Sequence, residues 1–449
     1  MPTDFRCPRS ATAPHIPGVA VYRSIPVPAV RDLAVVGARI LPVADADGNR
    51  AAPIEDGVML VRDGRIAQVG TAAEVAVPQD GSLTVVDGSG MVLTPGLVEA
   101  HGHLGVHEDG EGWSGDDTNE RTVVDGAKLR ALDAINPAEL GFKDALRGGV
   151  TSAVVKPGSA NPIGGRTAAV KTWGRVVDEM VIREDVSVKS ALGENPKRVH
   201  GEKDRMPSVR MGVAAALREA FVDAQNYARA RDRAQEEGTP FDRDLGRETL
   251  AAVLAGDLIW DQHCHRADDI ATAIRLSEEF GYRLVVNHGT EGHLLADYLA
   301  EKGIDVIVGP LMTSRSKVEL RNRTLATPAA LAQAGVRIAL TTDHPVIPIN
   351  FLIHEASLAV KEGLDPVVAL ESLTINPAAM LGLDDRVGAL APGRDADFVL
   401  WTQDPLELDA RASRVFVDGR EVFRYDEESG LADVADPWGP TRIAQPSTR

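Results

Sequence analysis

Over residues 95–372 the chain alternates short apolar segments with longer helical ones, and this alternation constrains the fold more than any other feature. The apolar segments predict seven strands, at residues 96–101, 150–155, 186–192, 258–263, 283–287, 305–308 and 337–342. Strands that alternate with helices are joined by crossovers and therefore run parallel. An eighth strand is predicted at residues 167–173, after a glycine-rich loop. Eight such strands close a (β/α)8, or TIM, barrel.

Helical segments separate several of these strands. They are predicted at residues 137–146, 268–280, 292–302, 328–334 and 365–372. Residues 209–256 are mostly helical in pattern and strongly charged around 229–237. We expect this longer segment to be an insertion over the rim of the barrel.

The two ends of the chain have a pattern typical of a smaller sheet. Before the barrel, strands are predicted at residues 33–41, 57–61, 65–69 and 83–87, with a hairpin turn at 63–64. After it, strands are predicted at residues 396–401 and 412–417. We therefore predict that residues 31–95 and 382–425 combine into a composite β-sandwich side domain beside a barrel of residues 96–381. Residues 1–30 are then an N-terminal arm, and residues 426–449 a C-terminal tail.

Composition bounds the class of protein. The 449 residues are 44% hydrophobic and 25% charged, which is ordinary for a globular protein. The net charge of −18 argues against nucleic acid and anionic membranes as partners and leaves a small molecule. There is no run of about 18 apolar residues and no signal peptide pattern. The two cysteines, Cys7 and Cys264, lie in dissimilar contexts, so we expect a reducing, cytoplasmic location. The sequence does not decide whether the chain forms a homo-oligomer.

Polar side chains stand at the ends of several predicted barrel strands. They are His101, His103, His263, His265, His288 and Asp343. Because the strand ends of a parallel barrel converge on one face, these side chains should meet at a single site. Residues i and i+2 of a strand point to the same side, so His101 and His103 can direct two imidazoles at one ion. Imidazole and carboxylate ligands predict a divalent metal, with zinc first and manganese, iron or nickel as alternatives.

These residues also carry a family resemblance. The segment Thr94-Pro95-Gly96-Leu97-Val98-Glu99-Ala100-His101-Gly102-His103 resembles the first-strand signature of the amidohydrolase superfamily. His263, His288 and Asp343 follow in the order of that family, and residues 376–397 are similar to its return into the side domain. The resemblance covers residues 31–425 and is strongest to the imidazolonepropionase-related branch. It implies a TIM barrel with a composite β-sandwich.

The resemblance implies a hydrolase in which metal-activated water cleaves a C–N bond. The substrate class would be a small polar or anionic amide, cyclic amide or amidine-like molecule. His101, His103, His263 and His288 would be metal ligands. Asp343 would be both a ligand and the catalytic group that orients the water, takes its proton and delivers it to the leaving group. His265 lies two residues after His263, so both side chains would point to the same side of the strand. His265 therefore either replaces His263 as a ligand or acts on the substrate as a catalytic residue.

Members of this family differ in one further ligand, and two candidates lie close together here. Lys189 would be carbamylated and bridge two metals if it points into the barrel. Glu194 would instead ligate a single metal. The alternative for Lys189 is an outward-facing side chain whose amine reaches solvent. One ion and two ions therefore both remain open.

Two basic loops suggest that the substrate is held through an anionic group. Lys156 and Arg166 flank the glycine-rich loop after the second strand, and Arg315 follows the strand at 305–308. Arginine holds carboxylate or phosphate with two parallel hydrogen bonds. His344, which directly follows Asp343, joins this predicted substrate-binding set. The competing interpretation is a set of solvated surface charges.

Two other functions share the same predicted site. A deaminase, deacetylase or decarboxylase would use the same ligands, and the loops would decide among them. A binding or scaffold protein that kept the fold but lost catalysis is the other alternative, since fold alone does not give function. Such a protein usually lacks metal ligands, whereas this chain keeps them.

Overall fold

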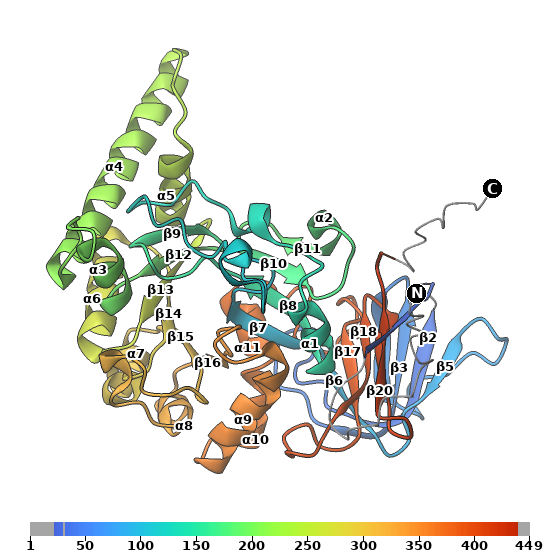
Figure 1. The fold of residues 1–449 in the computed structure, drawn as a ribbon. Coiled ribbons are helices and arrows are strands. Elements are labelled where there is room, and N and C mark those ends of the chain that lie inside the picture. The colour runs from blue at the N-terminus through green and yellow to red at the C-terminus, as the bar shows by residue number, and fades with distance from the viewer. Residues whose placement is uncertain (1–21, 30–31, 439–449) are drawn as a thin grey trace, which may run out of the picture.

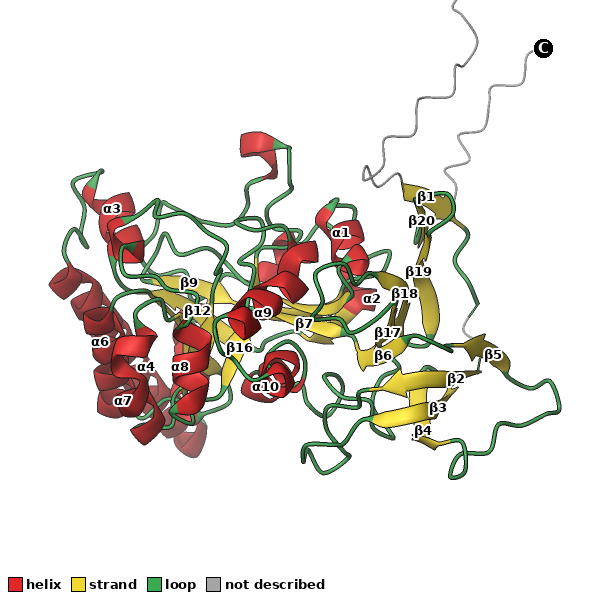
Figure 2. Ribbon diagram, turned by 90° about the horizontal axis from the view of Figure 1, so that it is seen from below, coloured by secondary structure: helices red, strands yellow, loops and turns green. Residues whose placement is uncertain are grey.

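The computed structural model describes residues 22–29 and 32–438 (Figure 1). The position of Cys7 and most of the predicted N-terminal arm therefore lie outside the described residues. The strands form three sheets, and most of the helices flank two of them (Figures 1 and 2). None of the helices in the described ranges is long and apolar enough to cross a membrane.

Two of the sheets contain the predicted parallel strands. The six-stranded sheet runs in the order β16 (Ile338–Leu340), β15 (Asp305–Val308), β14 (Leu284–His288), β13 (Ile259–Cys264), β12 (Ser187–Ala191) and β9 (Ile163–Arg166). The four-stranded sheet runs β11 (Val181–Arg183), β10 (Ala168–Lys171), β8 (Val150–Val155) and β7 (Leu97–Gly102). Strands β12 to β16 are parallel to one another, and β7 is parallel to β8. These strands confirm the seven predicted from the apolar segments.

The predicted eighth strand is wrong in direction. Residues 167–173 do contain β10, but β10 runs antiparallel to β8, and the preceding β9 runs antiparallel to β12. Residues 156–167, which connect β8 to β10, contain the short strand β9 and no helix. Parallel strands are usually joined by a crossover that contains a helix, whereas this connection reverses the chain.

Helices surround the parallel strands. Their bounds are α1 (Gly141–Arg147), α2 (Val177–Met180), α3 (Glu194–Gly201), α6 (Ala267–Phe280), α7 (Ala296–Glu301), α8 (Thr327–Gln333), α9 (Leu352–Lys361), α10 (Pro366–Glu371) and α11 (Ile375–Met380). The helices predicted within residues 209–256 are confirmed as α4 (Arg210–Glu237) and α5 (Leu245–Ala255), and α4 extends beyond the sheets in Figure 1. Phe221 of α4 anchors it by packing on Trp260 and Tyr282, with ring centroids 4.8 and 4.9 Å away.

The third sheet joins the two ends of the chain. Its order is β1 (Tyr22–Ile25), β20 (Leu431–Ala435), β19 (Arg420–Asp426), β18 (Ala412–Val417), β17 (Phe398–Trp401), β6 (Val92–Pro95), β2 (Leu33–Ile40), β3 (Ile54–Arg62) and β4 (Arg65–Thr71). A further strand, β5 (Thr84–Asp87), pairs with β2. The N-terminal and C-terminal parts meet where β6 pairs antiparallel with β17. Strands β1 and β20 pair in parallel, in segments where only an arm and a tail were expected.

A buried ion cluster links β10 to the segment before β17. The Lys171 ammonium lies 2.8 Å from Asp395 and 2.5 Å from Asp397, and all three side chains are almost fully buried. Burial alone would lower the pKa of Lys171, but the neighbouring carboxylates of Asp397, Asp418 and Asp395 outweigh burial and raise it. The ammonium is therefore charged and holds the third sheet against the four-stranded one.

Candidate active site

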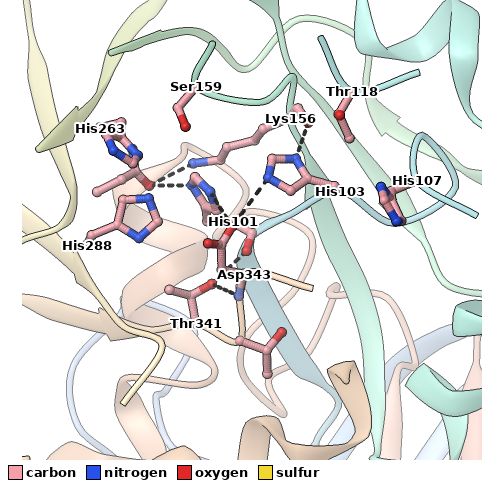
Figure 3. A network of polar contacts seen from close by, with 12 residues as sticks. His101, His103, His107, Thr118, Lys156, Ser159, His263, His288, Thr341 and Asp343 are labelled. Atoms are coloured by element: carbon pink, nitrogen blue, oxygen red, sulfur yellow. Dashed lines mark hydrogen bonds and ion pairs between the residues drawn. The ribbon is translucent and has the colours of Figure 1, made fainter. Parts of the chain in front are cut away.

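The ends of β7 and β16 bring together the first two histidines and the aspartate (Figure 3). Nε2 of His101 lies 3.1 Å from Oδ1 of Asp343, and Nε2 of His103 lies 3.3 Å from the same oxygen. Asp343 has a positive φ of 53°, an unusual backbone for a residue other than glycine. Such strain persists where the surrounding structure enforces it, which is common at functional sites. The predicted convergence of these three residues is observed.

Strands β13 and β14 add three more imidazoles. The ring of His288 lies 4.4 Å from that of His263, 4.8 Å from that of His265 and 4.9 Å from that of His101, measured between centroids. Two groups have ligand atoms within 4.8 Å of one another: His263, His265 and His288, and also His101, His288 and Asp343. His288 belongs to both groups, and its φ of 71° is again positive.

Three atoms in this cluster that could bind a metal ion have no hydrogen-bond partner among the described residues. In the described part of the chain, Nδ1 of His263, Nε2 of His265 and Oδ1 of Asp343 are buried without a hydrogen bond. Burying an unpaired polar atom is costly, and such atoms need an explanation. Imidazole nitrogen and carboxylate oxygen are the donors that a zinc-like ion takes in proteins. The residues present therefore fit a divalent metal ion.

Protonation states agree with that fit. Burial is the largest cause that lowers the pKa of His101, His263, His265 and His288, so these rings are neutral, as metal ligands must be. Burial pushes the pKa of Asp343 upward, but the closely placed rings of His101 and His103 outweigh burial and hold the pKa well below its usual value. Asp343 is therefore a carboxylate.

Hydrogen bonds fix which nitrogen of three rings faces the cluster. Nδ1 of His103 lies 2.8 Å from the backbone oxygen of Lys156, and Nδ1 of His288 lies 2.8 Å from that of Gly309. Nδ1 of His101 lies 2.8 Å from Oδ1 of Asn287. Because these oxygens can only accept, each Nδ1 carries the hydrogen and each Nε2 keeps a free lone pair.

Lys156 lies behind the cluster and does not line the cavity. Its side chain is fully buried, and its ammonium forms an ion pair with Asp261 and lies 3.2 Å from Oδ1 of Asn287. Asp261 also accepts a hydrogen bond from Nδ2 of Asn287. In the structure, Lys156 therefore helps to hold Asn287, which contacts His101. The sequence had instead suggested that Lys156 contacts the substrate.

The two candidates for an additional ligand have different positions. Lys189 of β12 is 1% exposed, and its Nζ lies 3.3 Å from Nε2 of His101 inside the cavity. Burial lowers the pKa of Lys189 to about 8. Glu194 begins α3 outside the cavity lining, where its backbone N–H donates to Oε1 of Glu319 at 2.6 Å.

The remaining predicted substrate-binding residues also lie outside the cavity lining. Arg166 forms an ion pair of 2.9 Å with Asp185. Arg315 is exposed, and its Nε donates to the backbone oxygen of Arg321 at 3.1 Å. His344 is buried, and burial lowers its pKa to about 4.

Sequence reasoning missed one buried acid near the site, and within the predicted basic loop it singled out Arg315 rather than the two cations that line the cavity. Glu99 of β7 accepts hydrogen bonds from the backbone of His101 at 3.1 Å and from the backbone and hydroxyl of Thr342 at 3.0 and 2.6 Å. It therefore ties the end of β7 to the end of β16, and a lone acid in an apolar strand was the available signal. The cations are Lys317 and Arg323, which line the cavity from the loop after β15.

Comparison with known proteins places the chain in a family. The model of the amidohydrolase family matches residues 92–422. The amidohydrolase tasK of Hapsidospora irregularis is 31% identical over 392 residues, which is 82% of this chain but 40% of that protein, so the chain spans well under half of this relative. Imidazolonepropionase of Ralstonia nicotianae is 30% identical over 402 residues, covering 81% of this chain and 90% of that protein.

A solved structure supports the same assignment. The crystal structure of an amidohydrolase from Thermotoga maritima is 42% identical to this chain, with a TM-score of 0.83. The match covers 87% of this chain and all of the other. The resemblance noted in the sequence is confirmed, including its imidazolonepropionase-related branch. The chain belongs to the amidohydrolase family and is a hydrolase of carbon–nitrogen bonds.

Proposed function

We propose that this hydrolase opens the C–N bond of a small cyclic amide or amidine-like molecule with the help of bound zinc. The observation that carries the proposal is the convergence of five imidazoles and Asp343 on one cavity. Three buried nitrogen and oxygen atoms there have no hydrogen-bond partner among the described residues. A polar cluster of this kind is unfavourable without an ion and favourable with one.

His101, His103, His263 and His288 are proposed as ligands, together with Asp343. Lys189 is proposed as the additional ligand in preference to Glu194, because its amine lies in the cavity beside His101. A pKa of about 8 leaves part of the amine neutral at neutral pH. The neutral amine is the form that adds carbon dioxide and releases a proton to become a carbamate, and such a carbamate would supply oxygen ligands to the metal site.

The chain's own groups would handle the protons and the substrate. A bound divalent ion supplies Lewis acidity, which lowers the pKa of water toward neutrality. Asp343, held as a carboxylate by His101 and His103, accepts the proton of the attacking water and passes it to the leaving nitrogen. His265 shares a hydrogen bond of 2.8 Å with Thr290 and lines the cavity, so it is placed to contact the substrate.

The barrel and its boundaries complete the proposal. Thr341 donates to the backbone oxygen of His101 at 2.6 Å, and β16 lies against β7. These contacts support a barrel wall made of β7, β8 and β12 to β16 within residues 96–381, with the third sheet as a side domain. The buried free thiol of Cys264 supports a reducing compartment such as the cytoplasm.

The test combines metal exchange with product analysis. The purified chain is stripped with a chelator, reloaded with zinc or manganese, and assayed on hydantoins, cyclic imides, lactams and aminated heterocycles. We expect ring opening to disappear with the metal and to return with zinc. Full activity in the metal-free chain would contradict the proposal. Release of ammonia as the sole reaction would contradict it in favour of a deaminase.

A further inference from the structure

The middle of the loop after β15 forms part of the cavity wall and has few anchors. Lys317 and Leu320 line the cavity, and the buried Glu319 stands between them in the sequence, in the short helix η4 (Val318–Leu320). Among the described residues, the hydrogen bonds of residues 313–321 stay within the loop, apart from those that Glu319 accepts. The position of this part of the wall therefore depends on what holds Glu319.

Glu319 is held by Arg210, the first residue of α4. Nη2 of Arg210 lies 2.9 Å from Oε1 of Glu319, and its Nε lies 3.1 Å from each carboxylate oxygen of Asp269 in α6. The side chains of Glu319 and Asp269 are 2% and 4% exposed, and within the described ranges neither forms an ion pair with another cation. One guanidinium thus joins the loop to α4 and α6, which contact each other (Figure 1).

The backbone at the start of α3 completes the cluster. The N–H of Glu194 donates to the same Oε1 of Glu319 at 2.6 Å. Gly193, just before it, has a φ of 86°, and a Cβ at this position would lie 2.5 Å from Oε1 of Glu319 and 3.1 Å from Oδ2 of Asp269. Glycine permits both this backbone and this close approach. Three helices and the loop therefore converge on Arg210.

The two carboxylates depend on Arg210 for their charge balance. Burial raises the pKa of Glu319 to about 7 and also raises that of Asp269, and the charge of Arg210 acts against both shifts. Oε2 of Glu319 is buried and lacks a hydrogen-bond partner in the described chain. Buried charges are unfavourable unless they are paired, and the planar fork of arginine can pair with two carboxylates at once. Without Arg210 the cluster would repel itself.

We propose that Arg210 is a positioning residue: through Glu319 it ties the cavity wall to α4 and α6, and so sets the shape of the substrate cavity. Arg210 itself does not line the cavity, so it acts on a ligand only through the loop. α4 then shapes the active site in addition to packing on Trp260 through Phe221. The inference goes beyond the proposed reaction, because a displaced wall affects any ligand that contacts it.

Hydrogen exchange tests the anchoring directly. The amides of Leu320 and Arg321 are hydrogen-bonded within the loop, so their exchange reports its opening. In Arg210→Met we expect these amides to exchange about tenfold faster than in the wild type, because the loop opens more often. The control is Arg218→Met, which removes another arginine of α4, in an exposed pair 2.8 Å from Glu279 of α6, and should exchange as the wild type. Unchanged exchange in Arg210→Met would overturn the proposal.

A triple variant separates positioning from charge balance. Arg210→Met alone leaves two buried carboxylates unpaired and lowers the stability of the whole fold. Adding Asp269→Asn and Glu319→Gln removes those charges. We expect the midpoint of thermal unfolding to return toward that of the wild type, while the loop amides still exchange fast, because no guanidinium ties the loop to α4. If exchange slowed together with the return of stability, Arg210 would only neutralise charge, and the positioning role would be refuted.

Two probes of different size test the effect on the cavity. The zinc-loaded chain is titrated calorimetrically with acetohydroxamate, which is small, and with benzohydroxamate, whose ring is large enough to contact the wall at Leu320. In Arg210→Met we expect benzohydroxamate to bind about tenfold more weakly and acetohydroxamate to keep its affinity. Equal weakening of both probes would show a general defect and contradict the proposal. A wild type that binds neither probe would contradict the zinc site alone, since the exchange experiment decides this inference without metal.

Discussion

Oδ1 of Asn287 lies 2.8 Å from Nδ1 of His101, and this contact determines which nitrogen of His101 faces the cavity. The amide cannot rotate freely, because its Nδ2 donates to Asp261 and its Oδ1 lies 3.2 Å from the Lys156 ammonium. Its oxygen is thus presented to His101, which must donate from Nδ1. The lone pair on Nε2 is then available to a metal ion.

Removing this amide should weaken metal binding without removing a ligand. We expect Asn287→Leu to bind zinc about 10- to 100-fold more weakly than the wild type, the usual effect of losing a group that orients a ligand. Competition with a chromogenic chelator measures the affinity. Asn49→Leu, at an exposed turn, is the control. An unchanged affinity in Asn287→Leu would show that the ring of His101 is held by packing alone.

The metal content of variants distinguishes Lys189 from Glu194 as the additional metal ligand. Because the amine of Lys189 lies in the cavity beside His101, Lys189→Ala should lower the metal content per chain. Glu194→Gln should keep it, since Glu194 lies outside the lining. Elemental analysis of the purified variants measures both. The assignment fails if Glu194→Gln loses metal and Lys189→Ala does not.

Replacing Asp343 should lower the catalytic rate more than the stability of the fold. In Asp343→Asn the side chain no longer accepts a proton, so we expect kcat to fall by about 100-fold or more. The histidines should still hold metal, which elemental analysis can verify. The matched control is Asp268→Asn, which alters a half-exposed partner of Arg266 at a helix start. A kcat near that of the wild type would remove Asp343 from the proton transfer.

The cluster of histidines and Asp343 was predictable because two simple rules apply to it. Side-chain parity within a strand puts His101 and His103 on one side, and parallel strands bring His263, His288 and Asp343 to the same end. Each of these histidines lies at or directly after a regular strand, and Asp343 lies three residues after the end of β16. The cluster therefore follows from the order of strands alone.

The supporting and substrate-facing residues were not predictable in this way. Lys156 is buried because Asp261 neutralises it, and these residues are 105 positions apart in the sequence. Arg315 and Lys317 lie in a loop without periodicity, so nothing local shows that Lys317 lines the cavity and Arg315 is exposed. Likewise, strand propensity does not reveal that β10 runs antiparallel to β8.

Glu355 should make stability depend on pH. It is fully buried in α9, and its carboxylate accepts hydrogen bonds from the backbone of Leu311 at 2.6 Å and of Met312 at 3.3 Å. Burial outweighs these bonds and raises the pKa of Glu355 to about 7. Because this pKa lies above the unfolded value, protonation stabilises the fold at low pH. That contribution, roughly 3 kcal/mol at most, is lost as the pH rises from about 4 to about 7.

A variant that cannot titrate isolates this contribution. Between about pH 5 and pH 8 the wild type loses the stabilising protonated form of Glu355, whereas Glu355→Gln does not titrate. The thermal stability of Glu355→Gln relative to the wild type should therefore rise steadily over this range. The midpoint of thermal unfolding, measured across this range, tests the difference. Glu362→Gln, at an exposed position just after α9, should follow the wild type. Parallel curves for the wild type and Glu355→Gln would contradict the prediction.

Lys171 should contribute to stability through the two carboxylates that it neutralises. Asp395 has a second partner in Arg386, 2.7 Å away, but burial raises the pKa of Asp397 to about 6, which shows how poorly its charge is solvated. Lys171→Met leaves Asp397 uncompensated and should cost about 3–5 kcal/mol, as for other broken buried ion pairs. Thermal unfolding measures the loss. Arg175→Met, which breaks an exposed pair with Glu179, should cost less than about 1 kcal/mol.

The double variant decides whether charge is the cause. If the loss in Lys171→Met comes from the stranded carboxylate, adding Asp397→Asn should recover part of it, because the amide has no charge to bury. The coupling energy between the two sites should then be well above the error of about 0.5 kcal/mol seen for independent positions. Additive losses would instead mean that Lys171 acts through the packing of its aliphatic stem between the sheets.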